Sequence, residues 1–129
     1  MQTVKVLIVD DARQVREELE TVLTLTTGIE VVGQAANGLE AVQLTKTLHP
    51  DVVLLDLEMP VLDGYEAARK IRTHCPCVYL VALTVHGYEE ARYKALQAGV
   101  DIFMVKGAPV DQLVSALFQK GEKNDYQSC

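Results

Sequence analysis

The stretch Val52-Val53-Leu54-Leu55-Asp56 decides the fold of this 129-residue chain, because it is a short apolar run that ends on a carboxylate. Pro50 precedes it and Met59-Pro60 follows it, so the run has the length of one strand between two turns. An unbroken apolar run is typical of a parallel strand that is covered on both faces. Packing alone does not call for an aspartate at its end, whereas α/β proteins bind ligands at the carboxyl ends of such strands. Asp56 is therefore our candidate for the residue that carries the chemistry.

Length and composition predict one globular domain. The chain has 49% hydrophobic and 23% charged residues, and 12 basic against 18 acidic side chains give a net charge of −6. This acidic balance argues against direct contact with nucleic acid, because the phosphate backbone requires a basic surface. No apolar run approaches the roughly 18 residues of a membrane span, so we expect no membrane association. The three cysteines lack zinc-type spacing, and we expect a protein of the reducing cytoplasm.

Apolar runs alternate with helical repeats along the whole chain. Five strands are predicted, over residues 4–9, 30–35, 52–56, 78–83 and 100–105. A helix follows each strand, which predicts an α/β protein with a doubly wound parallel sheet and helices on both faces. For five strands, the flavodoxin-like order 2-1-3-4-5 places the ligand crevice between the first and third strands. Those strands end at Asp10-Asp11 and at Asp56, so the fold and the acidic residues point to one crevice.

The helix boundaries are predicted from caps and apolar stripes. Three capping-box-like pairs are expected, Asp11 with Gln14, Asn37 with Glu40, and Asp63 with Glu66. Leu96 of the fourth helix and Val110 of the fifth are expected to face the core. Pro109 fits the first turn of the fifth helix, and Gly121 is expected to end it. We therefore predict one domain over residues 1–121, followed by a polar tail or the start of a linker over 122–129.

The acidic strand ends predict a site for a hard divalent cation. Asp10, Asp11 and Asp56 would repel one another if all were ionised in one crevice. All-oxygen ligation favours Mg²⁺, with Mn²⁺ as the alternative, and Mg²⁺ keeps positions for water and phosphate oxygens. Thr84 ends the fourth strand with a hydroxyl, and Lys106 ends the fifth with a cation. Either residue alone would be ordinary, but together with the carboxylates they predict phosphoryl transfer to a carboxylate nucleophile.

Four motifs follow this pattern from the first strand to the last. They are VLIVDDA (Val6–Ala12), VVLLDLEMPVLDG (Val52–Gly64), LT (Leu83-Thr84) and AGVDIFMVK (Ala98–Lys106). With these motifs the chain resembles the receiver domains of two-component response regulators, the CheY-like family, up to about Gly121. The resemblance implies that Asp56 is the phosphoacceptor and takes its phosphoryl group from a histidine kinase, a phosphotransfer protein or a small donor. The implied Mg²⁺ ligands are Asp56, Asp11 directly, Asp10 indirectly, and the backbone carbonyl of Glu58.

The same resemblance implies a conformational switch. Thr84 and Lys106 would bind the phosphoryl oxygens, and Phe103, three residues before the lysine, would be the aromatic switch residue. Phosphorylation adds charge and acceptor oxygens beside them. An inward movement of the Thr84 hydroxyl would free space for the Phe103 ring. The surface of the fourth helix, fifth strand and fifth helix would then repack, which makes it the expected output surface.

Three departures from the family pattern affect the expected site. Val85 stands where the family usually has a smaller residue, so it would restrict access to Asp56. Glu58 and His86 occupy positions that tune dephosphorylation in the family, and Glu58 could orient water or repel phosphodonors. The family commonly has a cis proline directly after the lysine, but this chain has Gly107-Ala108 there, which leaves a cis peptide open.

Two rival functions remain open from the sequence. One is a pseudo-receiver that is never phosphorylated and acts as a protein-interaction module; Val85 favours it, and the full set of acids argues against it. The other is a magnesium-dependent phosphatase, which needs a second carboxylate as general acid, and Glu58 is the one nearby candidate. We expect a phosphoacceptor switch rather than a turnover enzyme. A flavodoxin is excluded, because the first strand leads into Asp10-Asp11 instead of a Ser/Thr/Gly phosphate loop.

Expected partners beyond the phosphodonor also come from the resemblance. The pattern Lys106-Gly107-Ala108 resembles receivers that are joined to helix-turn-helix DNA-binding output domains. Such a domain would control transcription, and it is not part of this chain. The exposed parts of the last two helices could pair with a second copy to form a homodimer or could dock an output domain.

Overall fold

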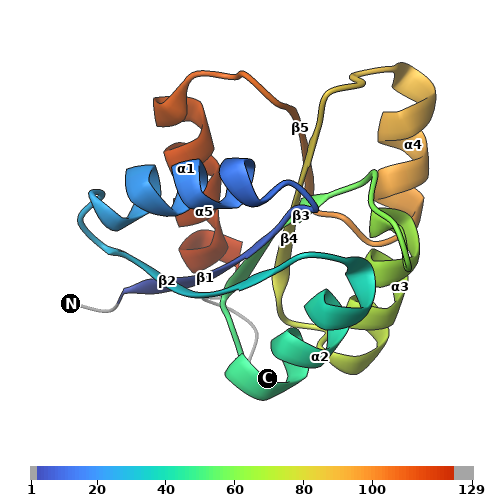
Figure 1. The fold of residues 1–129 in the computed structure, drawn as a ribbon, viewed down its shortest axis with the longest axis horizontal. Coiled ribbons are helices and arrows are strands. Elements are labelled where there is room, and N and C mark those ends of the chain that lie inside the picture. Colours follow the sequence, from blue (N-terminus) through green and yellow to red (C-terminus); the bar gives the residue numbers. More distant parts are fainter. Residues whose placement is uncertain (1–2, 124–129) are drawn as a thin grey trace.

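The computed structural model describes residues 3–123, which form a five-stranded sheet flanked by five helices. The strands are β1 (Val4–Val9), β2 (Ile29–Ala35), β3 (Val52–Asp56), β4 (Tyr79–Thr84) and β5 (Ile102–Val105). The helices are α1 (Arg13–Thr24), α2 (Gly38–Leu48), α3 (Gly64–His74), α4 (Glu89–Gln97) and α5 (Val110–Lys123). All neighbouring strands are parallel, in the order β2-β1-β3-β4-β5, which confirms the predicted topology (Figure 1).

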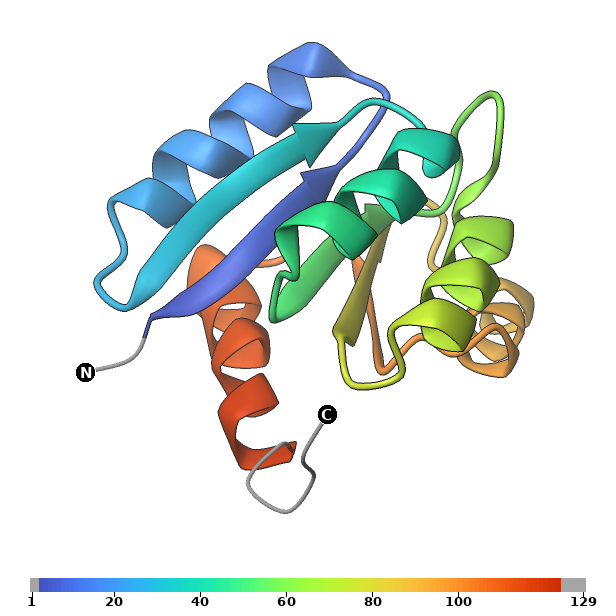
Figure 2. The same ribbon diagram turned by 90° about the horizontal axis from the view of Figure 1, so that it is seen from below.

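Helices cover both faces of the sheet. Figures 1 and 2 show α1 and α5 on one face and α2, α3 and α4 on the other. The central strand β3 supplies both cores, because Val53 and Leu55 pack under α2, α3 and α4. Val52 and Leu54 point the other way and pack under α1 and α5. This double coverage explains why the strand is an unbroken apolar run.

Two of the three predicted caps are confirmed. Asn37 Oδ1 accepts a hydrogen bond from the backbone N–H of Glu40 at 2.9 Å at the start of α2. Asp63 Oδ1 accepts from the N–H of Glu66 at 2.9 Å at the start of α3. Each bond satisfies one of the free N–H groups in the first turn of a helix. Both helices therefore begin at the residues that the sequence indicates.

The predicted cap of α1 is wrong. The cap residue is Ala12, which makes no side-chain capping bond, and Asp11 does not serve as the cap. Asp10 Oδ1 instead accepts from the N–H of Ala12 at 2.8 Å. The local sequence pattern favoured Asp11 as a cap, but its carboxylate lies with those of Asp10 and Asp56 at the end of the sheet.

Two side chains predicted to face the core, and one predicted helix end, differ in the structure. Leu96 is exposed because α4 meets the core through the small side chain of Ala95. Val110 is exposed because α5 packs through Leu113 and its neighbours later in the helix. The helix also runs through Gly121 to Lys123, since an interior glycine costs a helix only about 1 kcal/mol. The rest of the predicted tail, residues 124–129, lies outside the described residues.

The segment after β3 folds back tightly against the strand. A Cβ atom at Gly64 would overlap the carbonyl oxygen of Asp56 and the Cα of Leu57. The N–H of Gly64 donates to the carbonyl of Leu57 at 3.1 Å. Only a glycine allows this approach, so the start of α3 lies directly against the strand end that carries Asp56. Within residues 3–123, no helix is long and apolar enough to cross a membrane.

Candidate functional site

The carboxyl ends of β1 and β3 bring three carboxylates together, as predicted. One oxygen from each of Asp10, Asp11 and Asp56 lies within 4.8 Å of the other two. Asp10 and Asp56 are only 2% and 5% exposed, whereas Asp11 is open to solvent. In the part of the chain that the structure describes, no other cluster of His, Cys, Asp and Glu side chains could hold a metal. An all-oxygen donor set with one exposed member fits a hard divalent cation.

Lys106 extends into this crevice from the end of β5. Its Nζ lies 2.7 Å from Asp10 Oδ2 and 3.6 Å from Asp56 Oδ1. Burial alone lowers the pKa of Lys106, but the hydrogen bond to Asp10 and the charge of Asp56 outweigh burial and raise it. The lysine therefore remains a cation and offsets part of the carboxylate repulsion.

Asp56 has a perturbed carboxyl group. Burial, followed by the nearby charges of Asp10 and Asp11, raises the pKa of Asp56 to about 6. The N–H of Glu58, 3.2 Å from Asp56 Oδ1, and the charge of Lys106 act in the opposite direction. Most Asp56 side chains are thus ionised at neutral pH, and the charge is held where little water can stabilise it. A carboxylate in this state is suited to act as a nucleophile or a metal ligand.

The end of β4 places Thr84 on the next strand. The sheet register pairs Asp56 with Leu83, so Thr84 lies one residue beyond the acceptor level. Thr84 is buried, and its Oγ1 accepts from the N–H of His86 at 3.2 Å. Val85, which follows it, is 61% exposed.

Glu58 and His86 are in contact, which the sequence did not indicate. Glu58 Oε1 lies 3.4 Å from His86 Nε2, and the pair joins the loops that follow β3 and β4. The His86 ring also stacks on Tyr88, with ring centroids 5.7 Å apart and an interplanar angle of 6°. Both members of the pair are about half exposed, so the contact lies at the surface beside Asp56 rather than inside the crevice.

Phe103 and the segment after Lys106 are the remaining parts of the predicted site. Phe103 is partly buried on the α2–α4 side of the sheet and pairs with Ala82 of β4. The described residues contain no cis peptide bond, so the peptide after Lys106 is trans. Gly107 has a φ of 95° and provides the turn into α5.

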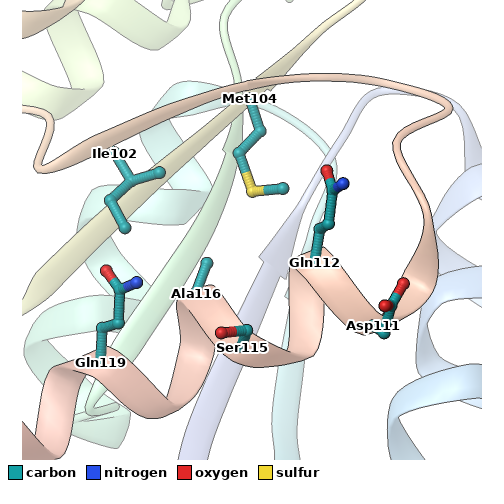
Figure 3. Close-up of a pocket in the computed structure, with 7 residues that line it drawn as sticks. All are labelled: Ile102, Met104, Asp111, Gln112, Ser115, Ala116 and Gln119. Atoms are coloured by element: carbon teal, nitrogen blue, oxygen red, sulfur yellow. The ribbon is translucent and has the colours of Figure 1, made fainter.

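A separate hollow of about 410 Å³ lies between β5 and α5 (Figure 3). Ile102 and Met104 form its apolar side, and Gln112, Ser115 and Gln119 lie along the helix. None of the predicted phosphoryl or metal residues lines it. The candidate site is therefore the acidic crevice, and this hollow belongs to the surface of β5 and α5.

Comparisons with known proteins agree with this geometry. The family model of the response regulator receiver domain matches residues 6–118. The response regulator GacA of Pseudomonas syringae pv. syringae (strain B728a) is 40% identical over 114 residues, which are 88% of this chain and 53% of GacA. The chain thus spans about half the length of this curated relative.

Solved structures show the same fold. The signal receiver domain of the putative response regulator NarL from Mycobacterium tuberculosis matches with a TM-score of 0.90 and 31% identity, covering 95% of this chain and 98% of that one. A DNA-binding response regulator of the LuxR family from Staphylococcus aureus matches with a TM-score of 0.84 and 26% identity, covering 91% and 98%. From its motifs, its strand order and these matches, the chain belongs to the response regulator receiver domain family.

Proposed function

We propose that this receiver domain is a phosphoacceptor switch in which Asp56 takes a phosphoryl group while Mg²⁺ occupies the acidic crevice. The observation that carries the proposal is the meeting of three carboxylates with Lys106, whose Nζ lies 2.7 Å from Asp10 and 3.6 Å from Asp56. This arrangement supplies a nucleophile, a cation and a set of metal ligands at neighbouring strand ends.

The proposed donor is a phosphohistidine of a histidine kinase or phosphotransfer protein. An Asp56 oxygen forms a bond to phosphorus as the P–N bond breaks, and the electron pair of that bond stays on the imidazole nitrogen. Thr84 and Lys106 are assigned to the phosphoryl oxygens. Thr84 ends β4, the strand next to β3, and Lys106 follows β5 and brings its Nζ to 3.6 Å from Asp56 Oδ1.

The proposed metal ligands are Asp56, Asp11 directly, Asp10 indirectly and the backbone carbonyl of Glu58. Mg²⁺ is proposed with Mn²⁺ as the alternative, because all-oxygen donors suit both cations and Mg²⁺ typically binds through one or two carboxylates and keeps positions for phosphate oxygens. When bound, it neutralises charge on the transferred phosphoryl group. The carboxylates would otherwise repel the incoming anion, so the metal and Lys106 act together.

The proposed output is a change of the α4–β5–α5 surface. Phe103 lies partly buried on β5, where a movement of Thr84 on the paired strand can reach it. The hollow between β5 and α5 in Figure 3 belongs to the same surface. A surface that changes with the charge at Asp56 can bias the binding of an output domain or of a second copy in a homodimer.

The remaining proposals concern the protein as a whole. A DNA-binding relative of the LuxR family supports a helix-turn-helix output domain that controls transcription. We propose that the receiver domain ends near residue 121, within the last turn of α5, and that residues 122–129 lead into a polar tail or are the start of a linker. We also propose a cytoplasmic location and a switch that does not turn over a substrate.

The alternative is a pseudo-receiver. Val85 is largely exposed, and the Glu58–His86 pair joins the two loops beside Asp56, so access to the acceptor could be closed. A protein of this kind would keep the fold and the carboxylates but would accept no phosphoryl group.

Intact mass spectrometry separates the two functions. After incubation with acetyl phosphate and Mg²⁺, we expect the protein to gain the mass of one phosphoryl group. A chelator in excess of Mg²⁺ should abolish the gain, because the three carboxylates then lack their counter-charge. No gain with acetyl phosphate or with purified phosphorylated histidine kinases would contradict the proposal and support the pseudo-receiver.

A further inference from the structure

Arg16 lies outside the crevice but is bonded directly to it. Its Nη1 donates to the main-chain oxygen of Asp10 at 2.7 Å, and its Nε donates to Gln34 Oε1 on β2 at 3.0 Å. Gln34 in turn donates from Nε2 to Glu20 Oε1 at 2.8 Å, one turn further along α1. One partly buried guanidinium therefore joins α1 and β2 to the end of β1.

The bond to Asp10 also affects Asp11. The Asp10 carbonyl belongs to the planar peptide group that leads into Asp11, so fixing this oxygen fixes the direction from which the Asp11 side chain starts. Within residues 3–123, no hydrogen bond or ion pair holds the Asp11 carboxylate itself. Its position therefore depends on the backbone. The Asp10 carboxylate holds the N–H of Ala12 on one side of Asp11, and Arg16 holds the Asp10 carbonyl on the other.

We propose that Arg16 is a positioning residue of the metal site, which holds the Asp10–Asp11 peptide so that both carboxylates face Asp56. The inference rests on the proposed function, since it concerns the Mg²⁺ site named there. Two guanidinium nitrogens point to two different acceptors, and a planar fork can do this whereas a lysine ammonium cannot span both in the same way.

The role of Arg16 is geometric. Its guanidinium bonds to the main-chain oxygen of Asp10 and to Gln34 Oε1, and to none of the three carboxylates of the crevice. Lys106 already supplies the cation inside the crevice. Removing Arg16 is therefore expected to disturb ligand geometry rather than the charge balance of the site.

The test is the Mg²⁺ affinity of the folded protein without any phosphodonor, measured by calorimetric or NMR titration. Arg16→Met and Arg16→Lys are both expected to weaken binding about tenfold, as is common for residues that orient metal ligands. Arg13→Met is the matched control, because Arg13 is an exposed arginine of the same helix that pairs with Glu17. Its Mg²⁺ affinity is expected to equal that of the wild type.

Denaturant unfolding of the variants in the presence of a chelator shows whether Arg16 positions the metal ligands or only stabilises the fold. Arg16 variants that unfold at lower denaturant concentration but bind Mg²⁺ normally when folded would overturn the inference. Wild-type affinity in Arg16→Lys alone would overturn the geometric role in favour of a charge effect. If the wild type itself binds no Mg²⁺, the proposed metal site fails and the inference fails with it. Normal wild-type binding with unchanged affinity in both variants would overturn this inference and leave the proposed function standing.

Discussion

Replacing Asp56 by asparagine is expected to abolish phosphoryl incorporation and, at the same time, to stabilise the metal-free protein. The amide has no carboxylate oxygen to attack phosphorus, so the mass gain with acetyl phosphate and Mg²⁺ should disappear. The amide is also neutral, and it has nearly the same shape as the buried carboxylate beside Asp10 and Asp11. Its oxygen can still accept the hydrogen bond from the N–H of Glu58. One substitution should therefore lower activity and raise the free energy of unfolding.

The gain in stability should depend on pH in a defined direction. Burial and the neighbouring carboxylates raise the pKa of Asp56 from 3.8 to about 6, so the folded protein binds this proton more tightly than the unfolded chain. This contribution to wild-type stability falls as the pH rises from about 4 to about 6 and stays low above that range. The Asp56→Asn variant does not titrate there. The difference between the two proteins should grow through this window by on the order of 1–2 kcal/mol, allowing for solvent screening.

Urea unfolding in a chelator at several pH values between 4 and 7.5 measures this difference. Asp111→Asn is the matched control, because Asp111 is an exposed aspartate in the first turn of α5. It should keep phosphoryl incorporation and show no comparable pH-dependent gain. Incorporation that persists in Asp56→Asn would place the phosphoryl group on another residue. A difference in stability that stays constant from pH 4 to pH 7.5 would show that the pKa of Asp56 is not raised.

The order of the strands could be predicted because it depends on patterns that repeat along the chain. The run Val52–Leu55 is apolar at every position, and the structure buries alternate residues of it in two different cores. The crevice followed from topology, since parallel strands of this order bring the ends of β1 and β3 together. The meeting of Asp10, Asp11 and Asp56 therefore required no knowledge of side-chain contacts.

The details that were missed depend on contacts between distant segments. Arg16 bonds to a main-chain carbonyl, and such an acceptor has no residue-type signature in a sequence. The Glu58–His86 pair depends on the shapes of two loops rather than on any spacing. Leu96 was expected in the core from its helical spacing, but α4 covers the edge of the sheet and buries little more than Ala95. Local sequence patterns predict the helices and strands, whereas tertiary packing determines which side chains are buried and which contact one another.

Replacing Arg72 by alanine is expected to lower the free energy of unfolding by about 3 kcal/mol. From α3, its guanidinium donates to the carbonyl of Gly99 through Nε and Nη2, at 3.1 and 2.7 Å. Its Nη1 donates to the carbonyls of Pro76 and Val78, each at 2.8 Å, and Nη2 lies 2.8 Å from Asp101 Oδ2. The side chain is 25% exposed, so in the alanine variant water would replace only part of the hydrogen bonds that these acceptors lose. One arginine thus holds the segments that enter β4 and β5.

Arg69→Ala is the matched control for this prediction. Arg69 lies one turn earlier on α3 and pairs with Glu66 at the surface, where an ion pair contributes less than about 1 kcal/mol. Urea unfolding followed by circular dichroism suits both variants, because the chain has no tryptophan. Arg72→Lys should fall between the wild type and Arg72→Ala, since it keeps a cation near Asp101 but lacks the fork that reaches three carbonyls. Equal losses for Arg72→Ala and Arg69→Ala would mean that strand pairing, rather than this arginine, holds the two segments.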